Sequence, residues 1–348
     1  MKNDGRYNDF DLPFFRNEIS SIIPDRVLDF HAHIWMSEHW KVVPWETDAA
    51  GAKYMVTQEQ YSIEELIDDG RMLFPGKTYE AVCFGLPTPA ADLEKTNAYS
   101  AKAGGNPGIY PLIVTGRDII TPDRLRQMIC GDGFYGYKVF LNWYGNDYGS
   151  VTVEDMIGPA EMEIAHELNL VVLLHVPRDE RLADPEIQAG VRHLSKEYPG
   201  AKIVLAHCGR AYLPDEMKKA IGSIKDLENV YLDTAMVMDP LVIERVFDTI
   251  DSSRLVFATD VPVALMRGRR VQVADHWVDL VYEDYAPSAY RVQSNNMRAT
   301  FMVYEIIHAI SRAGEMAGLS TDMINDVFFN NGMNVLKGVR NSAGGEGE

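Results

Sequence analysis

A regular alternation of apolar runs and helix-like segments constrains the fold of this chain more than any other feature. The apolar runs begin near eight positions, which are Val27, Glu80, Ile109, Tyr135, Leu170, Lys202, Val230 and Leu255. Alternation of this kind is typical of βα units that build a parallel sheet. Because eight parallel strands can close on themselves, we predict an α/β fold, a (β/α)8 TIM barrel.

Helix-start signals lie between these runs. Thr121, Thr152, Asp184 and Asp239 each precede a helix-like segment, and three of the four are followed directly by proline. We further predict an eighth helix over residues 297–317 and a terminal helix over residues 321–336, packed under the barrel. The predicted organisation is an N-terminal extension (1–25), a barrel (26–340) and a disordered Gly/Glu-rich tail (341–348).

Two connections, residues 34–77 and 261–298, are too long to be simple turns between a strand and its helix. They follow the first and the eighth predicted strands, so we expect them on the catalytic face as pocket walls or lids. The alternative role is a subunit interface in a homodimer, and the two roles are compatible. The first connection carries Trp35, Trp40, Trp45, Tyr54 and Tyr61, and the second carries Arg267, Arg269, Arg270, His276 and Trp277.

Composition narrows the partners and the compartment. A net charge of -18 argues against nucleic-acid and anionic-membrane partners, which need basic patches. No apolar stretch approaches membrane-spanning length, and the N-terminus lacks the apolar core of a signal peptide. The chain has 3 cysteines and no CxxC pair, so we expect reduced thiols in a cytoplasmic protein.

Candidate metal ligands stand at the ends of four apolar runs. His31 and His33 end the first run, and residues two apart on a strand point to the same side. Three later runs end at His175, His207 and Asp260. Imidazole and carboxylate groups are common ligands of divalent transition metals. Because each group holds the same place in its own βα unit, the sequence predicts a metal-dependent enzyme.

Several motifs make the chain similar to a known family over residues 26–337. The chain resembles the amidohydrolase superfamily, in the branch that includes aminocarboxymuconate-semialdehyde decarboxylase, lactonases and hydratases. The motifs that carry the resemblance are Asp29-Phe30-His31-Ala32-His33, Gly136-Tyr137-Lys138, Val172-Leu173-Leu174-His175, Ile203-Val204-Leu205-Ala206-His207, Phe257-Ala258-Thr259-Asp260 and Phe329-Asn330-Asn331-Gly332.

The resemblance implies a ligand set and a proton-handling group. One divalent metal, zinc, would be held by His31, His33, His175 and Asp260. His207 would lie beside the metal-activated water as base or electrophile, and Asp260 would accept a proton from that water. The alternative for His207 is a fifth ligand in a binuclear site.

Lys138 determines the expected metal count. We favour an unmodified Lys138 that contacts Asp260 or the substrate. The alternative is a carboxylated lysine that bridges two metals, as in some members of the superfamily. Asp233, near the end of the seventh strand, is expected to be a hydrogen-bond partner of a ligating histidine.

Arginines near the site histidines suggest a carboxylic acid substrate. Arg178 and Arg210 each follow a site histidine by three residues, and a guanidinium group can bind a carboxylate through two hydrogen bonds. The alternative is that both make ordinary salt bridges. Trp143, with Trp35 and Tyr144, would line a ring-sized pocket, unless these side chains pack in the core.

The leading functional prediction is a metal-dependent hydrolase that uses water to attack an ester, lactone or amide carbonyl of a small organic acid. The alternative is a metal-dependent lyase, a non-oxidative decarboxylase or a hydratase, acting on an unsaturated or aromatic acid. A binding protein that has kept the barrel is the third possibility. The complete ligand set argues against it, since a degenerate copy should lose ligands first.

Overall fold

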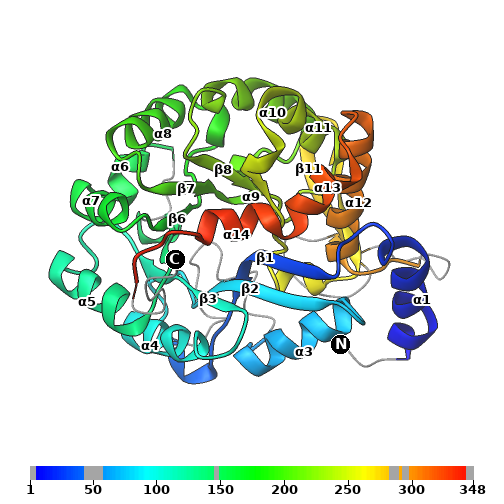
Figure 1. Cartoon of the computed structure of the whole chain (residues 1–348), viewed down its shortest axis with the longest axis horizontal. Helices are drawn as coiled ribbons and strands as arrows, with labels where there is room; N and C mark the ends of the chain where they lie inside the picture. Colours follow the sequence, from blue (N-terminus) through cyan, green and yellow to red (C-terminus); the bar gives the residue numbers. More distant parts are fainter. Residues whose placement is uncertain (1–4, 43–57, 145–148, 282–289, 292–297, 342–348) are drawn as a thin grey trace.

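Parallel strands form the centre of the molecule, and helices surround them (Figure 1). The computed structural model describes residues 5–42, 58–144, 149–281, 290–291 and 298–341. The central strands are β1 (Arg26–His33), β2 (Thr78–Phe84), β3 (Ile109–Pro111), β4 (Ile113–Thr115), β5 (Gly136–Val139), β6 (Val171–Leu174), β7 (Lys202–Leu205), β8 (Val230–Asp233) and β9 (Leu255–Val256).

Backbone hydrogen bonds join these strands into a closed ring. β3 and β4 are two halves of one strand separated by Leu112, whose N–H donates to the Cys83 carbonyl at 2.8 Å. Across the last seam, the Phe30 N–H donates to the Phe257 carbonyl and the Asp260 N–H to the His31 carbonyl, both at 2.9 Å. The predicted (β/α)8 barrel is confirmed, and every strand begins within two residues of its predicted start.

Burial on both faces explains why the strands read as continuous apolar runs. In β6, Val171 and Leu173 belong to the apolar cluster inside the barrel, whereas Val172 and Leu174 belong to the cluster under the helices. All four residues are fully buried. A strand with two covered faces needs apolar residues at every position, which is typical of parallel sheets.

The helices follow the strands as the sequence predicts. They are α3 (Ile63–Leu73), α4 (Leu93–Ala103), α5 (Pro122–Asp132), α6 (Val153–Met156), α7 (Pro159–Glu167), α8 (Pro185–Glu197), α9 (Ala206–Arg210), α10 (Pro214–Ala220), α11 (Pro240–Thr249), α12 (Met302–Met316), α13 (Thr321–Phe328) and α14 (Asn330–Leu336). Each of the four predicted start residues is the N-cap of a helix, and the side chains of Thr152, Asp184 and Asp239 accept backbone N–H bonds there.

The predicted single terminal helix is wrong, because α13 and α14 are separate helices that break at Phe329 (φ -145°, ψ -63°). The Asn331 amide donates to the carbonyls of Ser252 and Leu255, both at 2.9 Å, and so ties α14 to the start of β9. Gly332 lies so close to Leu28 that a Cβ there would come within 2.8 Å of its side chain. These contacts turn α14 across the barrel, as Figure 1 shows, and a straight helix could not make them.

The connection after β9 folds into a small sheet, which the sequence did not predict. It contains the antiparallel hairpin β10 (Gly268–Val273) and β11 (His276–Val281), with β12 (Tyr290–Arg291) beside β11. A short helical N-terminal segment, comprising η1 (Tyr7–Asp11), α1 (Leu12–Phe14) and η2 (Phe15–Ile19), packs near its base. There the fully buried Asp11 carboxylate accepts a hydrogen bond from Arg267 Nε at 2.8 Å.

The long connection after β1 is described only at its two ends. Trp35 and Tyr61 are fully buried and pair through their backbones, so both pack in the core. Trp45 and Tyr54 lie outside the described residues, as does the tail beyond Asn341, and their predicted roles stay predictions. Among the described residues, every helix is too short or too polar to cross a membrane.

Candidate metal centre

The end of β1 and the turn after β9 bring two imidazoles and a carboxylate together. His31 and His33 project from the same side of β1, and Asp260 follows β9 at the seam where the barrel closes. One oxygen of Asp260 lies 3.0 Å from His33 Nε2 and 3.5 Å from His31 Nε2. One ligand atom from each of these residues lies within 4.8 Å of the others, a spacing that a single ion can bridge.

Asp233, at the end of β8, fixes the orientation of the His31 ring. Its carboxylate lies 2.8 Å from His31 Nδ1, and it also accepts backbone N–H bonds from His207 at 2.6 Å and Ala235 at 3.1 Å. Asp233 is therefore the hydrogen-bond partner expected for a ligating histidine, and it leaves Nε2 of His31 facing Asp260. Such partners raise the basicity of the ligand and select its tautomer.

His175 and His207 complete a group of four imidazoles. The centre of the His207 ring lies 4.9 Å from that of His31 and 5.1 Å from that of His175. His207 Nδ1 lies 3.0 Å from the Ala235 carbonyl, which can only accept, so the ring proton is on Nδ1 and Nε2 keeps a lone pair.

His175 has a buried Nδ1 atom without a hydrogen-bond partner among the described residues. A buried polar atom without a partner is unfavourable unless a ligand or water satisfies it. Burial lowers the pKa of His31, His33 and His175, so these rings are neutral, the form that binds a metal. The ligand atoms of His31, His33 and Asp260 therefore fit a divalent ion, as do those of His31, His207 and Asp233, whereas His175 belongs to neither of these close groups.

The backbone at the site is locally left-handed. Asp260 has φ +73°, and the run from His207 to Arg210 has φ values between +52° and +67°. Non-glycine residues adopt this region at a cost and are held there by surrounding contacts. Here the turns direct the side chains of Asp260 and His207 back over the end of the barrel.

Asp29 holds two of the ligand-bearing strands together. Its buried carboxylate accepts hydrogen bonds from the His31 N–H at 3.1 Å, the Thr259 N–H at 2.9 Å and the Tyr79 hydroxyl at 3.0 Å. Burial raises the pKa of Asp29 to about 7, although these bonds oppose the rise. Asp29 begins the first motif, but no role for it was predicted. Its only distinguishing feature in the sequence is that it is an acidic residue inside an apolar run.

Lys138 lies at the centre of the site. Its Nζ is 3.0 Å from His31 Nε2 and 4.6 Å above the centre of the Phe84 ring, and the side chain is fully buried. Burial lowers the pKa of Lys138 to about 8, and the charges of Asp233 and Asp260 partly oppose this shift. Burial alone would raise the pKa of Asp260, but the hydrogen bond with His33 and the neighbouring imidazoles of His31 and His207 lower it below its usual range.

The structure separates the two predicted substrate arginines. Arg178 turns away toward α8, where its guanidinium lies 3.3 Å from the Asp184 carboxylate. Arg210 donates to the Val176 carbonyl at 3.0 Å, and after burial its charge is the next largest influence lowering the pKa of His175. Arg210 is thus close to the metal centre.

Trp143 is half-buried in η5 (Leu141–Tyr144), after β5, and packs against the inner apolar cluster. Its buried indole N–H has no hydrogen-bond partner among the described residues.

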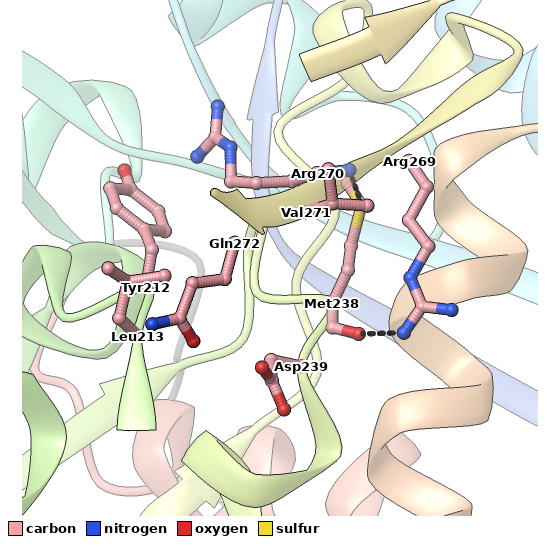
Figure 2. Close-up of a pocket in the computed structure, with 8 residues that line it drawn as sticks. All are labelled: Tyr212, Leu213, Met238, Asp239, Arg269, Arg270, Val271 and Gln272. Atoms are coloured by element: carbon pink, nitrogen blue, oxygen red, sulfur yellow. Dashed lines mark hydrogen bonds between the residues drawn. The ribbon is translucent and has the colours of Figure 1, made fainter. Parts of the chain in front are cut away.

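Sequence reasoning missed Tyr212, which lies beside this centre. The Tyr212 ring centre is 6.1 Å from that of His207 and 5.2 Å from that of Trp277 in β11. Figure 2 shows Tyr212 on one side of a cavity of about 120 Å³, below the side chain of Arg270. Tyr212 belongs to no motif, and only the tertiary fold places it near the ligands.

Comparison with models of known protein families gives a match over most of the chain. The amidohydrolase family model matches residues 28–280. None of the curated protein sequences matches this chain.

Solved structures share the fold at low sequence identity. A 4-oxalomesaconate hydratase from Rhodopseudomonas palustris has a TM-score of 0.55 at 15% identity, over 90% of this chain and 96% of that one. A structure described as a probable 2-pyrone-4,6-dicarboxylic acid hydrolase from Acinetobacter baumannii, with citric acid bound, has a TM-score of 0.54 at 10% identity, over 89% and 98%. A 5-carboxyvanillate decarboxylase from Novosphingobium aromaticivorans, complexed with manganese and a nitrobenzoic acid, has a TM-score of 0.54 at 12% identity, over 90% and 96%.

Proposed function

The chain belongs to the amidohydrolase family, and from that premise we propose that it is a metal-dependent hydrolase of a small organic acid. The observation that carries this proposal is a proton acceptor beside the ligand group. His207 Nε2 keeps its lone pair because Nδ1 donates to Ala235, and the centre of the His207 ring lies 4.9 Å from that of His31. An imidazole lone pair beside a metal suits the activation of water for attack on an ester, lactone or amide carbonyl.

The proposed cofactor is one Zn²⁺ per chain. The residues that would hold it are His31, His33 and Asp260, whose ligand atoms lie close together, and His175, whose unpaired Nδ1 we propose as the third nitrogen. A bound zinc ion would act as a Lewis acid and lower the pKa of a nearby water toward about 7. His207 would take the proton from that water and later deliver it to the leaving group.

The proposed substrate carries a carboxylate. Arg210 is the better placed of the two arginines, because it is close enough to His175 for its charge to lower the pKa of that ring, whereas Arg178 pairs with Asp184 beside α8. An unmodified Lys138 would contribute positive charge at the floor of the site, and Trp143 an apolar wall with one N–H donor. The citric acid bound to the Acinetobacter structure supports an organic acid as ligand.

A lyase is the second candidate, and two comparisons favour it. The structural neighbours include a hydratase and a decarboxylase that bound manganese and an aromatic acid. The rings of Phe84 and Phe140 flank Lys138 at 4.6 and 5.6 Å, which suits a planar acid. In the decarboxylase case, Lys138 and Arg210 would bind a substrate carboxylate, the bond between that carboxylate and the substrate carbon would break to release carbon dioxide, and a proton delivered through His207 would replace it on the carbon.

The deciding experiment combines metal analysis with an activity screen. The purified protein would be assayed for zinc and manganese, and its mass would show whether Lys138 carries a carboxyl group. It would then be screened against lactones, esters and amides of small acids and against unsaturated acids, with carbon dioxide scored separately. Incorporation of ¹⁸O from water into a product carboxylate supports the hydrolase. Carbon dioxide release without it supports a decarboxylase, and ¹⁸O in a new hydroxyl group, with a product heavier than the substrate by one water, supports a hydratase.

The proposal also includes the cellular compartment and the oligomeric state. The thiols of Cys83, Cys130 and Cys208 are all free, as expected of a cytoplasmic enzyme. A homodimer formed through the two long connections stays a prediction, which size-exclusion chromatography with light scattering would test.

A further inference from the structure

We propose that Tyr212 is the specificity-determining residue of this site, and that its hydroxyl donates a hydrogen bond to one oxygen of a planar, conjugated substrate. The inference rests on the proposed function, because it takes the metal centre as the place where the substrate binds. The inference names the residue that would recognise the substrate and the class of chemical group that this residue would recognise.

Tyr212 packs beside His207 at the edge of the candidate metal centre. It follows the left-handed turn that carries His207, and the two ring centres are 6.1 Å apart with a 40° tilt. The backbone N–H of Tyr212 donates to Glu216 at 2.9 Å, which fixes the residue at the start of α10. Among the described residues, none forms a hydrogen bond with its hydroxyl, so this oxygen is available to a ligand.

Two guanidinium groups hold the Tyr212 ring, and each has a carboxylate partner. The Arg270 guanidinium carbon lies 4.4 Å from the ring centre and that of Arg181 lies 5.5 Å from it. Arg270 binds Asp279 through two hydrogen bonds, at 2.8 and 3.0 Å, and Arg181 lies 3.0 Å from Glu216. The charges of Arg270 and Arg181 are therefore balanced locally. We call the side of the site formed by Tyr212, Arg270 and Trp277 the wall, and we do not expect it to bind a second carboxylate group of the substrate.

The chemistry of the wall defines the substrate group that fits it. The ring centres of Tyr212 and Trp277 are 5.2 Å apart and their planes meet at 63°, so the two rings present aromatic surface with one phenolic donor. Such a surface suits a flat, uncharged group with a single oxygen acceptor, such as a pyrone carbonyl, an enone or a ring hydroxyl. The substrate carboxylate would bind elsewhere, toward Arg210 or Lys138.

Tyr212 also sets the size limit of the site. On its other side it lines the cavity of about 120 Å³, together with Leu213, Met238 and Gln272 (Figure 2). The Tyr212 side chain thus borders both the His207 ring and a space large enough for a few atoms. Removing the ring would extend this space toward His207 and admit a longer planar group.

The first test uses benzohydroxamate, a planar zinc-binding probe, and the zinc-loaded full chain. Zinc content is measured first, and the dissociation constant is then measured by calorimetry. Tyr212→Phe should keep the zinc and weaken binding about 5- to 10-fold, the usual effect of losing one hydrogen bond. Tyr198→Phe is the matched control, because Tyr198 is also 9% exposed but lies at the end of α8, and its affinity should change less than about 2-fold.

The second test uses Tyr212→Ala and a larger probe, 2-naphthohydroxamate. The ratio of naphthyl to phenyl affinity should rise about 10-fold over the wild-type ratio if the ring sets the size limit. Unchanged benzohydroxamate affinity in Tyr212→Phe, or an unchanged ratio in Tyr212→Ala, overturns the role of Tyr212 alone. If the zinc-loaded wild-type protein does not bind benzohydroxamate, the bound zinc is not accessible to a ligand. That result would contradict the proposed function as well as the role of Tyr212.

Discussion

The hydrogen bond at one ring nitrogen decides what His207 can do. Because Nδ1 donates to Ala235, the chemistry is left to Nε2. Asparagine can keep the donor near the Nδ1 position but has no atom in place of Nε2, so His207→Asn should retain zinc. Turnover should fall by about 10²- to 10⁴-fold, the usual contribution of a general acid–base group. Zinc content and kcat would be measured together; loss of zinc would instead make His207 a ligand, and normal turnover would remove it from the mechanism.

His175 should behave in the opposite way. Its buried Nδ1 has no partner among the described residues, so we assign it to the metal. His175→Ala removes a ligand, and both zinc retention and activity should be lost after dialysis. His193→Ala is the control, because His193 lies exposed on α8 and should keep a full complement of zinc. Full zinc occupancy in His175→Ala would contradict the ligand set.

At the scale of elements, a buried ion pair fastens the N-terminal segment to the base of the β10–β11 hairpin. Asp11 and Arg267 have side chains 0% and 2% exposed, and the Thr300 hydroxyl also donates to Asp11 at 3.0 Å. Asp11→Asn removes one charge of a buried ion pair, a change that destabilises proteins by about 3–5 kcal/mol. We expect the free energy of unfolding, measured by urea denaturation, to fall by about this amount.

The control for this pair is an ion pair of the same chemistry on the surface. Asp68 and Arg71 lie 2.9 Å apart with side chains 74% exposed, and such pairs contribute about 0–1 kcal/mol. Asp68→Asn should therefore unfold at nearly the wild-type urea concentration. Equal effects of the two substitutions would show that the Asp11 pair does not hold the segment in place.

The elements also show what the sequence could and could not predict. The barrel strands were predictable because burial on both faces demands apolar runs. The candidate ligands could be proposed because they stand where those runs end. The hairpin was not, because Arg270 and Asp279 neutralise each other only when β10 and β11 pair. The break at Phe329 depends on contacts that Asn331 makes with residues 76 and 79 positions away, which no local pattern reveals.

At the scale of the whole molecule, the net charge opposes the proposed substrate. A charge of -18 creates a field that repels an organic anion at long range, whereas Lys138 and Arg210 attract it only near the site. Salt screens the long-range field first, because the Debye length falls from about 30 Å at 0.01 M to about 8 Å at 0.15 M.

Added salt should therefore raise kcat/KM for a carboxylic acid substrate, by about 2-fold or more between these two salt concentrations. The rise should come through faster association, and it should be absent for a neutral ester or amide of the same acid, which the field does not repel. Steady-state rates on the charged and neutral forms, measured in parallel, give this comparison without any substitution. A fall in kcat/KM with salt, confined to the acid, would mean that the local cations dominate the approach path. The net charge would then have no part in substrate capture, and Lys138 and Arg210 would steer the anion from a distance.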